Sequence, residues 1–272
     1  MQGAPGAPAT TGEGAAMLSD EDFELFTRWR IRAFGQKLRE ICMDEGMDSL
    51  TFEEKVGLCI EAERTAREDR KIQKAVRAAR FKLPGACIED IAYLPDRTLG
   101  RDRIARLASC AWIAANENLV ILSESGGGKS YVAQALGNAA CRKLLTVRYV
   151  RLNDMFRELN IARSEGALYD AIDAFSGPRL LILDDFLTTP IEDARNAIDL
   201  FEILERREGR GSTLIASQLE PDQWYLRIDS EICADSILGR IVKSARFIDI
   251  KGPDMRQYMA SKKAEEQEGY WE

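Results

Sequence analysis

The segment Ser123–Ser130, with the sequence SESGGGKS, constrains the fold of this chain more than any other. An apolar run, Leu119–Leu122, precedes it, and an amphipathic run, Tyr131–Leu145, follows it. A strand, a glycine-rich turn and a helix in this order form a phosphate cradle. Consecutive glycines can aim backbone N–H groups at a phosphate, and the helix adds its positive N-terminal end. The segment therefore predicts a nucleotide-binding α/β fold.

The residues of this loop have expected roles in binding a nucleoside triphosphate. Lys129 would reach the β- and γ-phosphates, and the Ser130 hydroxyl would ligate Mg²⁺. The pattern G-x-x-x-x-G-K-[ST] begins with glycine, whereas this chain has Ser123 at that position. We expect this serine either to distort the turn or to be accepted as a less flexible entry. The predicted nucleotide-binding residues of the loop are Ser125, Gly126, Gly127, Gly128, Lys129, Ser130 and Tyr131.

A second apolar run, Leu180–Leu183, ends in the two acids Asp184 and Asp185. A run of this length without alternation is typical of a strand buried on both faces, as in a parallel sheet flanked by helices. An acid at the carboxyl end of such a strand lies beside the phosphate loop, where ligands of open α/β sheets bind. We therefore expect Asp184 to hold Mg²⁺, directly or through water, and Asp185 to orient and polarise the attacking water.

The composition excludes several kinds of chemistry. The chain of 272 residues has no histidine, so Ser/His/Asp hydrolysis and His-ligated zinc sites are excluded. Its six cysteines form no CxxC pair, which indicates reduced thiols in a cytosol rather than a metal site. No segment has the ~18 consecutive apolar residues of a membrane helix. We expect a cytoplasmic protein without membrane association. The phosphate loop and the acidic pair indicate ATP and Mg²⁺ as its cofactors.

The net charge is −7, but the basic residues are unevenly distributed along the chain. Between Arg64 and Lys82 there are eight basic residues and two acidic ones, a local charge of +6. Helical spacing places most of the series on one side of a helix, which favours a polyanion-binding role over a merely solvated face. The predicted DNA-binding residues are Arg67, Arg70, Lys71, Lys74, Arg77 and Arg80.

The first part of the chain predicts a small helical domain, residues 19–95. Residues 1–18 are rich in Gly, Ala, Pro and Thr and predict a disordered tail rather than a signal peptide. One helix begins at Ser19 and is interrupted at Gly46. Another opens with the capping box of Thr51 and Glu54, runs into the basic stretch and ends at Pro84-Gly85.

After Gly100 the chain alternates helix and strand, which predicts a parallel sheet with crossover helices in an ATPase domain, residues 96–260, before a charged tail, 261–272. The expected strands are Leu119–Leu122, Val147–Val150, Leu180–Leu183, Thr213–Ala216 and Arg246–Ile250. The expected helices are Arg101–Trp112, Tyr131–Leu145, Leu152–Arg163, Glu192–Arg207 and Ile232–Val242.

Two residues of the last third are candidates for contact with the nucleotide. Gln218 follows the strand Ser212–Ala216 and would hydrogen-bond the γ-phosphate or the attacking water, unless it is an ordinary turn residue. Arg240 lies off the apolar face of the predicted helix Ile232–Val242. It is either a surface arginine or an arginine finger that reaches into the site of a neighbouring subunit.

With these residues in place, the chain from about Phe26 to Met259 resembles the IstB-like transposition helper ATPases, relatives of the DnaC helicase loaders in the AAA+ class. Many families share a phosphate loop, but the joint occurrence of several further stretches is specific. These are Phe52-Glu53-Glu54 before Glu61-Ala62-Glu63, Ala79-Arg80-Phe81 before Pro84, Asn118-Leu119, Leu183-Asp184-Asp185-Phe186, Arg210-Gly211-Ser212-Thr213-Leu214-Ile215-Ala216-Ser217-Gln218, Gln223-Trp224, and Gly252 followed by Met255-Arg256.

The resemblance implies a P-loop AAA+ sheet with flanking helices behind a small all-α N-terminal domain. It also implies a protein that assembles on duplex DNA with ATP as a homo-oligomer (a ring, spiral or filament), engages the cognate transposase and helps choose or prepare the target site. By the same resemblance, Gln218 is the sensor, Arg240 the finger and Arg256 a second sensor. Asp185 stands where many AAA+ proteins carry glutamate, and this shorter side chain should place the water less well.

The expected function is that of a slow, DNA-modulated ATPase that assists insertion-sequence transposition. Two alternatives stay open: a DnaC-like loader of a replicative helicase, and a nucleotide-gated DNA-binding module with little hydrolysis. A transposase gene beside this one would favour the helper. A steady-state ATPase assay with and without duplex DNA would separate the binding module from the two ATPases.

Overall fold

The computed structural model describes residues 18–268 of the chain. These residues form two compact units, one that ends at Arg70 and one that begins at Lys71. The division falls within a helix, α3 (Phe52–Ala79), whereas the sequence predicts a boundary between residues 95 and 96. The predicted tails, 1–18 and 261–272, lie partly outside the described residues, and the domain limits stay a prediction.

The first unit is helical. It contains α1 (Asp20–Arg28), α2 (Arg32–Met43), the 3₁₀ turn η1 (Glu45–Met47) and the first part of α3. α1 begins where predicted, because Ser19 and Asp22 form a capping box, and Thr51 and Glu54 form another at the start of α3. The predicted helix up to Gly46 is wrong in one respect, since Arg30 adopts a φ of 62° and separates α1 from α2.

α3 also ends earlier than the sequence predicts. It stops at Ala79, before Pro84, because Arg80 adopts a φ of 57°, in the left-handed region where a helix cannot continue. The segment from Phe81 onward therefore leaves the helix and packs within the second unit, where Leu83 N–H donates to Gln134 Oε1 at 2.7 Å. The end of the basic helix is thus fixed to the α/β core.

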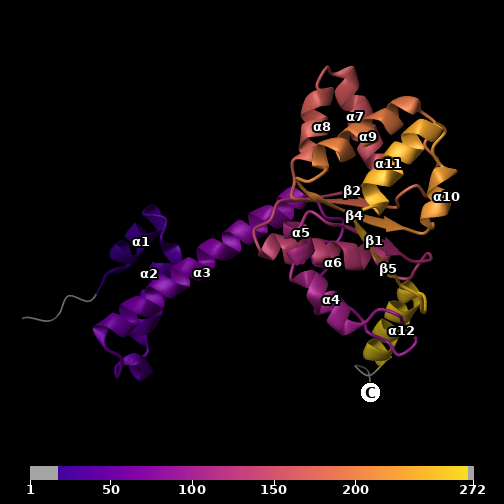
Figure 1. The fold of residues 1–272 in the computed structure, drawn as a ribbon. Coiled ribbons are helices and arrows are strands. Elements are labelled where there is room, and N and C mark those ends of the chain that lie inside the picture. Colours follow the sequence, from indigo (N-terminus) through magenta and orange to yellow (C-terminus); the bar gives the residue numbers. More distant parts are fainter. Residues whose placement is uncertain (1–17, 269–272) are drawn as a thin grey trace, which may run out of the picture. The chain divides into compact units, whose positions relative to one another are not determined.

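The second unit contains a parallel sheet of five strands in the order β2-β3-β4-β1-β5 (Figure 1). Each strand overlaps one that the sequence predicts, so the predicted sheet is confirmed. In this order the carboxyl ends of β1, β3 and β4 meet at one edge. The strands are β1 (Asn118–Leu122), β2 (Val147–Arg151), β3 (Leu180–Asp184), β4 (Ser212–Ser217) and β5 (Ala245–Asp249).

Helices cover both faces of this sheet (Figure 1). Alternate strand residues enter two separate cores: Leu119 and Ile121 lie in one, and Val120 and Leu122 in the other. Burial on both faces explains why β1 and β3 contain the unbroken apolar runs Leu119–Leu122 and Leu180–Leu183. One face carries α4 (Arg101–Ala108), α5 (Ala111–Ala114) and α6 (Lys129–Arg142); the other carries α7 (Leu152–Ser164), α8 (Leu168–Ser176), α9 (Ala194–Arg207), α10 (Pro221–Tyr225) and α11 (Glu231–Val242).

Several helices differ from the sequence prediction. The expected helix Arg101–Trp112 is divided into α4 and α5, because Cys110 adopts a φ of 61°. The sequence prediction also omitted α8, α10 and α12 (Met255–Glu268). Among residues 18–268, no helix is both long enough and apolar enough to cross a membrane.

Candidate nucleotide-binding site

The loop between β1 and α6 has the conformation that its glycines permit. Gly126 and Gly128 adopt φ values of 85° and 87°, in a region that residues with a side chain rarely enter. Gly128 is the last residue before α6, so the loop leads directly into the N-terminus of that helix. The positive end of α6 therefore adjoins the loop, the arrangement of an anion-binding helix terminus.

Ser123, which stands where the loop pattern has glycine, is accommodated by Gly127. Its side chain is buried, and a Cβ atom built on Gly127 would lie 1.9 Å from the Ser123 Oγ atom. Within the described residues, this hydroxyl has no hydrogen-bond partner. The serine thus fits beneath the turn only because residue 127 has no side chain.

We expect Gly127→Ala to weaken ATP binding by about 10- to 100-fold. The added methyl group would collide with the Ser123 hydroxyl, and overpacking of this kind costs about 1–3 kcal/mol. Isothermal titration calorimetry with ATP would measure the effect. The double variant Ser123→Gly/Gly127→Ala should regain most of the affinity, because it removes the colliding oxygen, and an equal loss in both variants would contradict this pairing.

Lys129, the first residue of α6, is buried among charged groups. Burial lowers the pKa of its ammonium group. The carboxylates of Asp185 and Asp184 oppose this shift, and the guanidinium of Arg256 adds to it. The structure therefore brings these four predicted site residues close enough to interact. A buried cation beside a phosphate loop offers charge that a bound phosphate would neutralise.

A hydrogen-bond network joins the loop to the carboxyl end of β3. The Ser130 hydroxyl and the Asp185 backbone N–H both donate to Asp184 Oδ1, each at 2.9 Å. The Tyr149 hydroxyl donates to Asp184 Oδ2 at 2.8 Å. Burial and the neighbouring carboxylate raise the pKa of Tyr149, which therefore stays a donor at neutral pH. Since Asp184 is only 1% exposed, these donors fix the orientation of its carboxylate.

Asp185 lies at the same site but has a different partner. Its backbone adopts a φ of 51°, and its Oδ2 atom lies 3.4 Å from Nε of Arg151. Arg151 and Tyr149 lie two residues apart on β2, with Arg151 in register with Asp184. Sequence reasoning missed both residues, because strand pairing decides which side chains of β2 reach the acids. Their spacing places them on one face of the strand, which is the only signal that the sequence contained.

Gln218 follows β4 at this edge of the sheet, but its side chain is exposed. The buried neighbour Ser217 is the residue held in place there: its hydroxyl accepts from Trp224 Nε1 at 3.0 Å and donates to the Phe186 carbonyl at 2.9 Å. The structure therefore places Gln218 at the end of β4, and within residues 18–268 no hydrogen bond or ion pair fixes its side chain.

The start of α12 lies beside the phosphate loop. Met255 N–H donates to the Gly126 carbonyl at 2.9 Å, and a Cβ atom built on Gly126 would lie 2.3 Å from Asp254 Oδ2. These contacts place Arg256 near enough to Lys129 to lower its pKa. The structure thus brings the predicted second sensor to the loop, although the sequence did not predict the helix that carries it.

Arg240 lies where the strands begin, at the end of the sheet opposite to the phosphate loop. Its carbonyl accepts from Nδ2 of Asn118, the first residue of β1, at 3.0 Å. Its guanidinium lies 4.4 Å from the centre of the Phe201 ring and pairs with Glu205 at 3.1 Å and Glu208 at 3.5 Å. The structure does not bring Arg240 to the nucleotide site of its own chain, so it can reach such a site only in another subunit.

A family model and several relatives match most of this sequence. The model of the IstB-like ATP binding protein family matches residues 30–264. The chain belongs to this family. The insertion sequence protein y4pL of Sinorhizobium fredii, which is named for ATP binding, is 36% identical over 242 residues, 89% of this chain and 98% of that protein. A similarly named protein of insertion sequence IS1162 from Pseudomonas fluorescens is 32% identical over 204 residues, 75% and 87% of the two chains.

Solved structures share the fold of this IstB-like chain at low sequence identity. DnaI is 22% identical, with a TM-score of 0.52, and the match covers 67% of this chain and 93% of that one. AMPPCP-bound DnaA from Aquifex aeolicus is 18% identical, with a TM-score of 0.55, and the match covers 67% and 55% of the two chains. The predicted P-loop AAA+ fold and the family resemblance are therefore confirmed.

The predicted DNA-binding residues of this IstB-like chain, which lie in α3 and at Arg80 directly after it, differ in their partners. In the first unit, the buried Glu63 carboxylate accepts from Arg67 at 2.8 Å and from Arg70 at 3.0 Å. In the second unit, Arg80 lies 3.6 Å from Glu158. Within the described residues, the predicted DNA-binding cations that form no ion pair are Lys71, Lys74 and Arg77.

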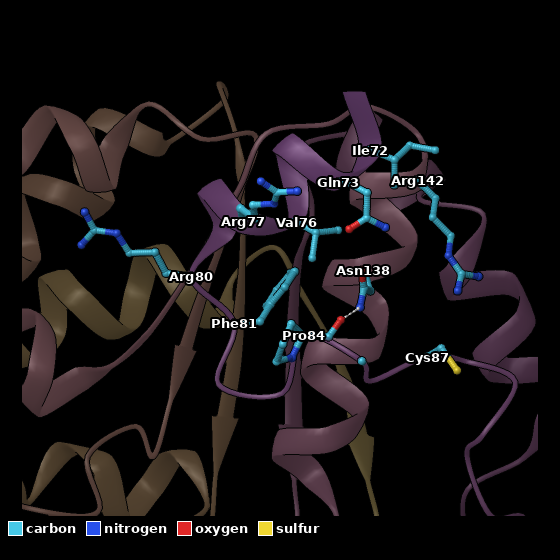
Figure 2. Close-up of a pocket in the computed structure, with 11 residues that line it drawn as sticks. Ile72, Gln73, Val76, Arg77, Arg80, Phe81, Pro84, Cys87, Asn138 and Arg142 are labelled. Carbon is cyan, nitrogen blue, oxygen red and sulfur yellow. Dashed lines mark hydrogen bonds between the residues drawn. The ribbon is translucent and has the colours of Figure 1, made fainter. Parts of the chain in front are cut away.

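The end of α3 borders a hollow of about 530 Å³ beside α6 (Figure 2). Apolar side chains from α3 and the following segment, among them Val76 and Phe81, line it together with Asn138 of α6. Asn138 Nδ2 donates to the Pro84 carbonyl at 2.8 Å, which holds the segment against α6. Arg142, at the end of α6, is a further cation at this hollow that sequence reasoning missed, because it lies outside the basic stretch.

Proposed function

We propose that this protein binds Mg²⁺·ATP at the loop between β1 and α6 and hydrolyses it slowly. The observation that supports this most directly is the 2.9 Å hydrogen bond between Ser130 of the loop and Asp184 at the end of β3. Ser130 and Asp184 lie 54 positions apart in the chain. They supply the hydroxyl and the carboxylate with which P-loop ATPases hold the metal ion. Membership of the IstB-like ATP binding protein family supports the same activity.

The oxygen donors at this site suit Mg²⁺. The ion favours one or two carboxylates together with substrate phosphates, rather than a cage built only from protein side chains. Ser130 and Asp184 would hold it, directly or through water, and no larger group of metal-ligating side chains exists within the described residues. When bound, the ion would neutralise charge on the β- and γ-phosphates.

The protein's own residues would then position the phosphates and the attacking water. Lys129 would bind the β- and γ-phosphates, and the ion pair with Arg151 would orient the Asp185 carboxylate. Asp185 would orient the water and polarise it, while Gln218 and Arg256 would contact the γ-phosphate from the ends of β4 and α12. Aspartate has a shorter side chain than the glutamate that many AAA+ proteins carry here, so it would place the water less well and turnover would be slow.

We further propose that the protein is a helper of insertion-sequence transposition that assembles on duplex DNA with ATP as a homo-oligomer and engages a transposase. The relatives named for insertion sequences support this context. The cations of α3 that form no ion pair within residues 18–268 support a contact with DNA phosphates. Steady-state phosphate release with and without duplex DNA, and with a transposase encoded beside this gene, tests the proposal. Stimulation by a replicative helicase alone would instead support the loader.

DNA binding should depend steeply on salt and little on sequence. If the α3 surface neutralises ~5 phosphates, the slope of log K against log[salt] should be about −4 to −5. Changing Lys71, Lys74 and Arg77 together to Gln should reduce that slope by about 2 to 3, because among the described residues no carboxylate pairs with these cations and would have to be released first. Fluorescence anisotropy on duplex DNA with ATP present measures both slopes.

A matched control removes the same number of charges elsewhere. Arg157, Arg195 and Arg246 are exposed and paired with Asp154, Asp193 and Glu117, so their change to Gln should leave the salt slope as in the wild type. An unchanged slope in the α3 variant would show that this helix is only a solvated face. DNA contacts would then have to come from other surfaces of the ATPase core.

A further inference from the structure

Arg97 is a buried arginine that neither the sequence motifs nor the proposed mechanism uses. It lies between α3 and α4 and is 9% exposed. Its Nη1 donates to the Ala92 carbonyl at 2.7 Å, and its Nη2 donates to the Gly127 carbonyl of the phosphate loop at 2.8 Å. Within the described residues, no carboxylate lies at ion-pair distance from it, although buried arginines ordinarily have such a partner.

The guanidinium lies against the glycines of the phosphate loop. A Cβ atom built on Gly128 would lie 2.8 Å from Arg97 Nη2, so the charge is in contact with the backbone that enters α6. Burial lowers the pKa of the guanidinium, as expected for a cation without a nearby anion, but an arginine still stays charged at neutral pH. A permanent positive charge is thus buried next to the loop.

The backbone around Arg97 is held from two sides. Thr98 N–H donates to the Lys251 carbonyl at 3.0 Å, and Lys251 N–H donates back to Thr98 Oγ1 at 2.8 Å. Gly252, with a φ of 144°, packs so closely that an added Cβ atom would lie 3.1 Å from the Arg97 Cα atom. The same C-terminal segment contacts the loop through Met255. Arg97 therefore cannot move away from the loop without displacing the start of α12.

We propose that Arg97 is a positioning residue of the nucleotide site. Its guanidinium fixes the Gly127 peptide and places an uncompensated positive charge behind the phosphate loop, so that the loop favours the ligand with more phosphates. This proposal rests on the proposed ATP binding. A buried charge without a partner is costly, and an anion bound at the loop is the group that would compensate it. The effect acts through space and through the Gly127 carbonyl, without contact between Arg97 and the ligand.

The charge and the hydrogen bond can be separated by substitution. Arg97→Gln keeps a donor for a loop carbonyl but removes the charge, whereas Arg97→Lys keeps the charge but loses the fork that reaches two carbonyls. If Arg97 only anchors the loop, both changes weaken AMP, ADP and ATP by the same factor. If its charge acts on the phosphates, the loss in Arg97→Gln grows with the number of phosphates.

Calorimetric titration of AMP, ADP and ATP into the full-length variants tests the proposal. For Arg97→Gln we expect ATP affinity to fall about tenfold, ADP affinity about threefold and AMP affinity little, while Arg97→Lys keeps the wild-type ratio of ATP to ADP affinity. The matched control is Arg179→Gln, because Arg179 also donates to two backbone carbonyls, of Arg210 and Ile113, far from the loop. It should change none of the three affinities.

The outcomes separate failure of this proposal from failure of the proposed function. Wild-type protein that binds no nucleotide would overturn both. Wild-type protein that binds ATP, with an unchanged ATP-to-ADP ratio in Arg97→Gln, would overturn only the role of Arg97. If thermal melting shows that Arg97→Gln is unfolded, the neutral variant Arg97→Met takes its place: an ATP-to-ADP affinity ratio below that of Arg97→Lys supports the proposal, and an equal ratio contradicts it.

Discussion

Lys129→Ala should reduce ATP hydrolysis by at least ~10²- to 10³-fold and weaken ATP binding strongly. The change removes the buried cation that begins α6 beside the loop, and loss of one preorganised donor to developing charge costs about this much in rate. The remaining Arg256 and Arg97 do not replace it, because neither lies at that position of the loop. Phosphate release and calorimetric ATP binding are the two measurements.

Asp185→Asn should separate these two steps. It keeps the size of the side chain but removes the carboxylate that is proposed to polarise the water, so ATP stays bound while hydrolysis falls. The control for Lys129→Ala is Lys143→Ala. Lys143 follows α6, and its ammonium group donates to the Ser109 carbonyl, away from the loop. A Lys129→Ala protein with wild-type turnover would contradict the whole assignment of the site. A variant that binds ATP like the wild type but has lost turnover would show that Lys129 acts only on the transition state of hydrolysis.

Arg240→Ala should lower the ATPase rate of the assembled protein by ~10³- to 10⁵-fold, the range that arginine fingers contribute in related nucleotide hydrolases. Arg240 lies at the edge of the sheet opposite to its own loop, as its contact with Asn118 shows. The effect must therefore arise between subunits. Stability should fall modestly, since the partly exposed ion pairs with Glu205 and Glu208 are worth at most about 1 kcal/mol each and the contact with the Phe201 ring about 0.5–1 kcal/mol.

Mixing two inactive variants tests whether the finger acts in trans. Arg240→Ala supplies an intact loop and Lys129→Ala an intact finger, so co-assembly of the two should rebuild some complete sites and recover part of the activity. The control for Arg240→Ala is Arg206→Ala. Like Arg240, Arg206 of α9 pairs with two acids, Asp173 and Glu202, but it is assigned no role in hydrolysis. Proven co-assembly without any recovery would contradict a trans finger.

The fold could be predicted in large part, because its central strands are buried on both faces. β1 and β3 therefore contain unbroken apolar runs in the sequence, and the loop and the acidic pair mark the carboxyl ends of these two strands, which lie on either side of β4. The helix boundaries were less predictable. Arg30, Arg80 and Cys110 adopt left-handed conformations that end or divide helices, although none of them is a glycine, because the surrounding packing outweighs their local preference.

The sequence by itself determined the phosphate loop and the acidic pair at the end of β3, since each lies within a short continuous stretch, and the family, since several such stretches occur together. Only the tertiary structure decided which distant residues join them. Strand pairing brings Tyr149 and Arg151 to the acids, and the packing of α12 brings Arg256 to the loop. Folding also places Arg97 behind Gly127 and Arg240 at the far edge. These placements depend on contacts between segments far apart in the chain, which no local pattern of residues encodes.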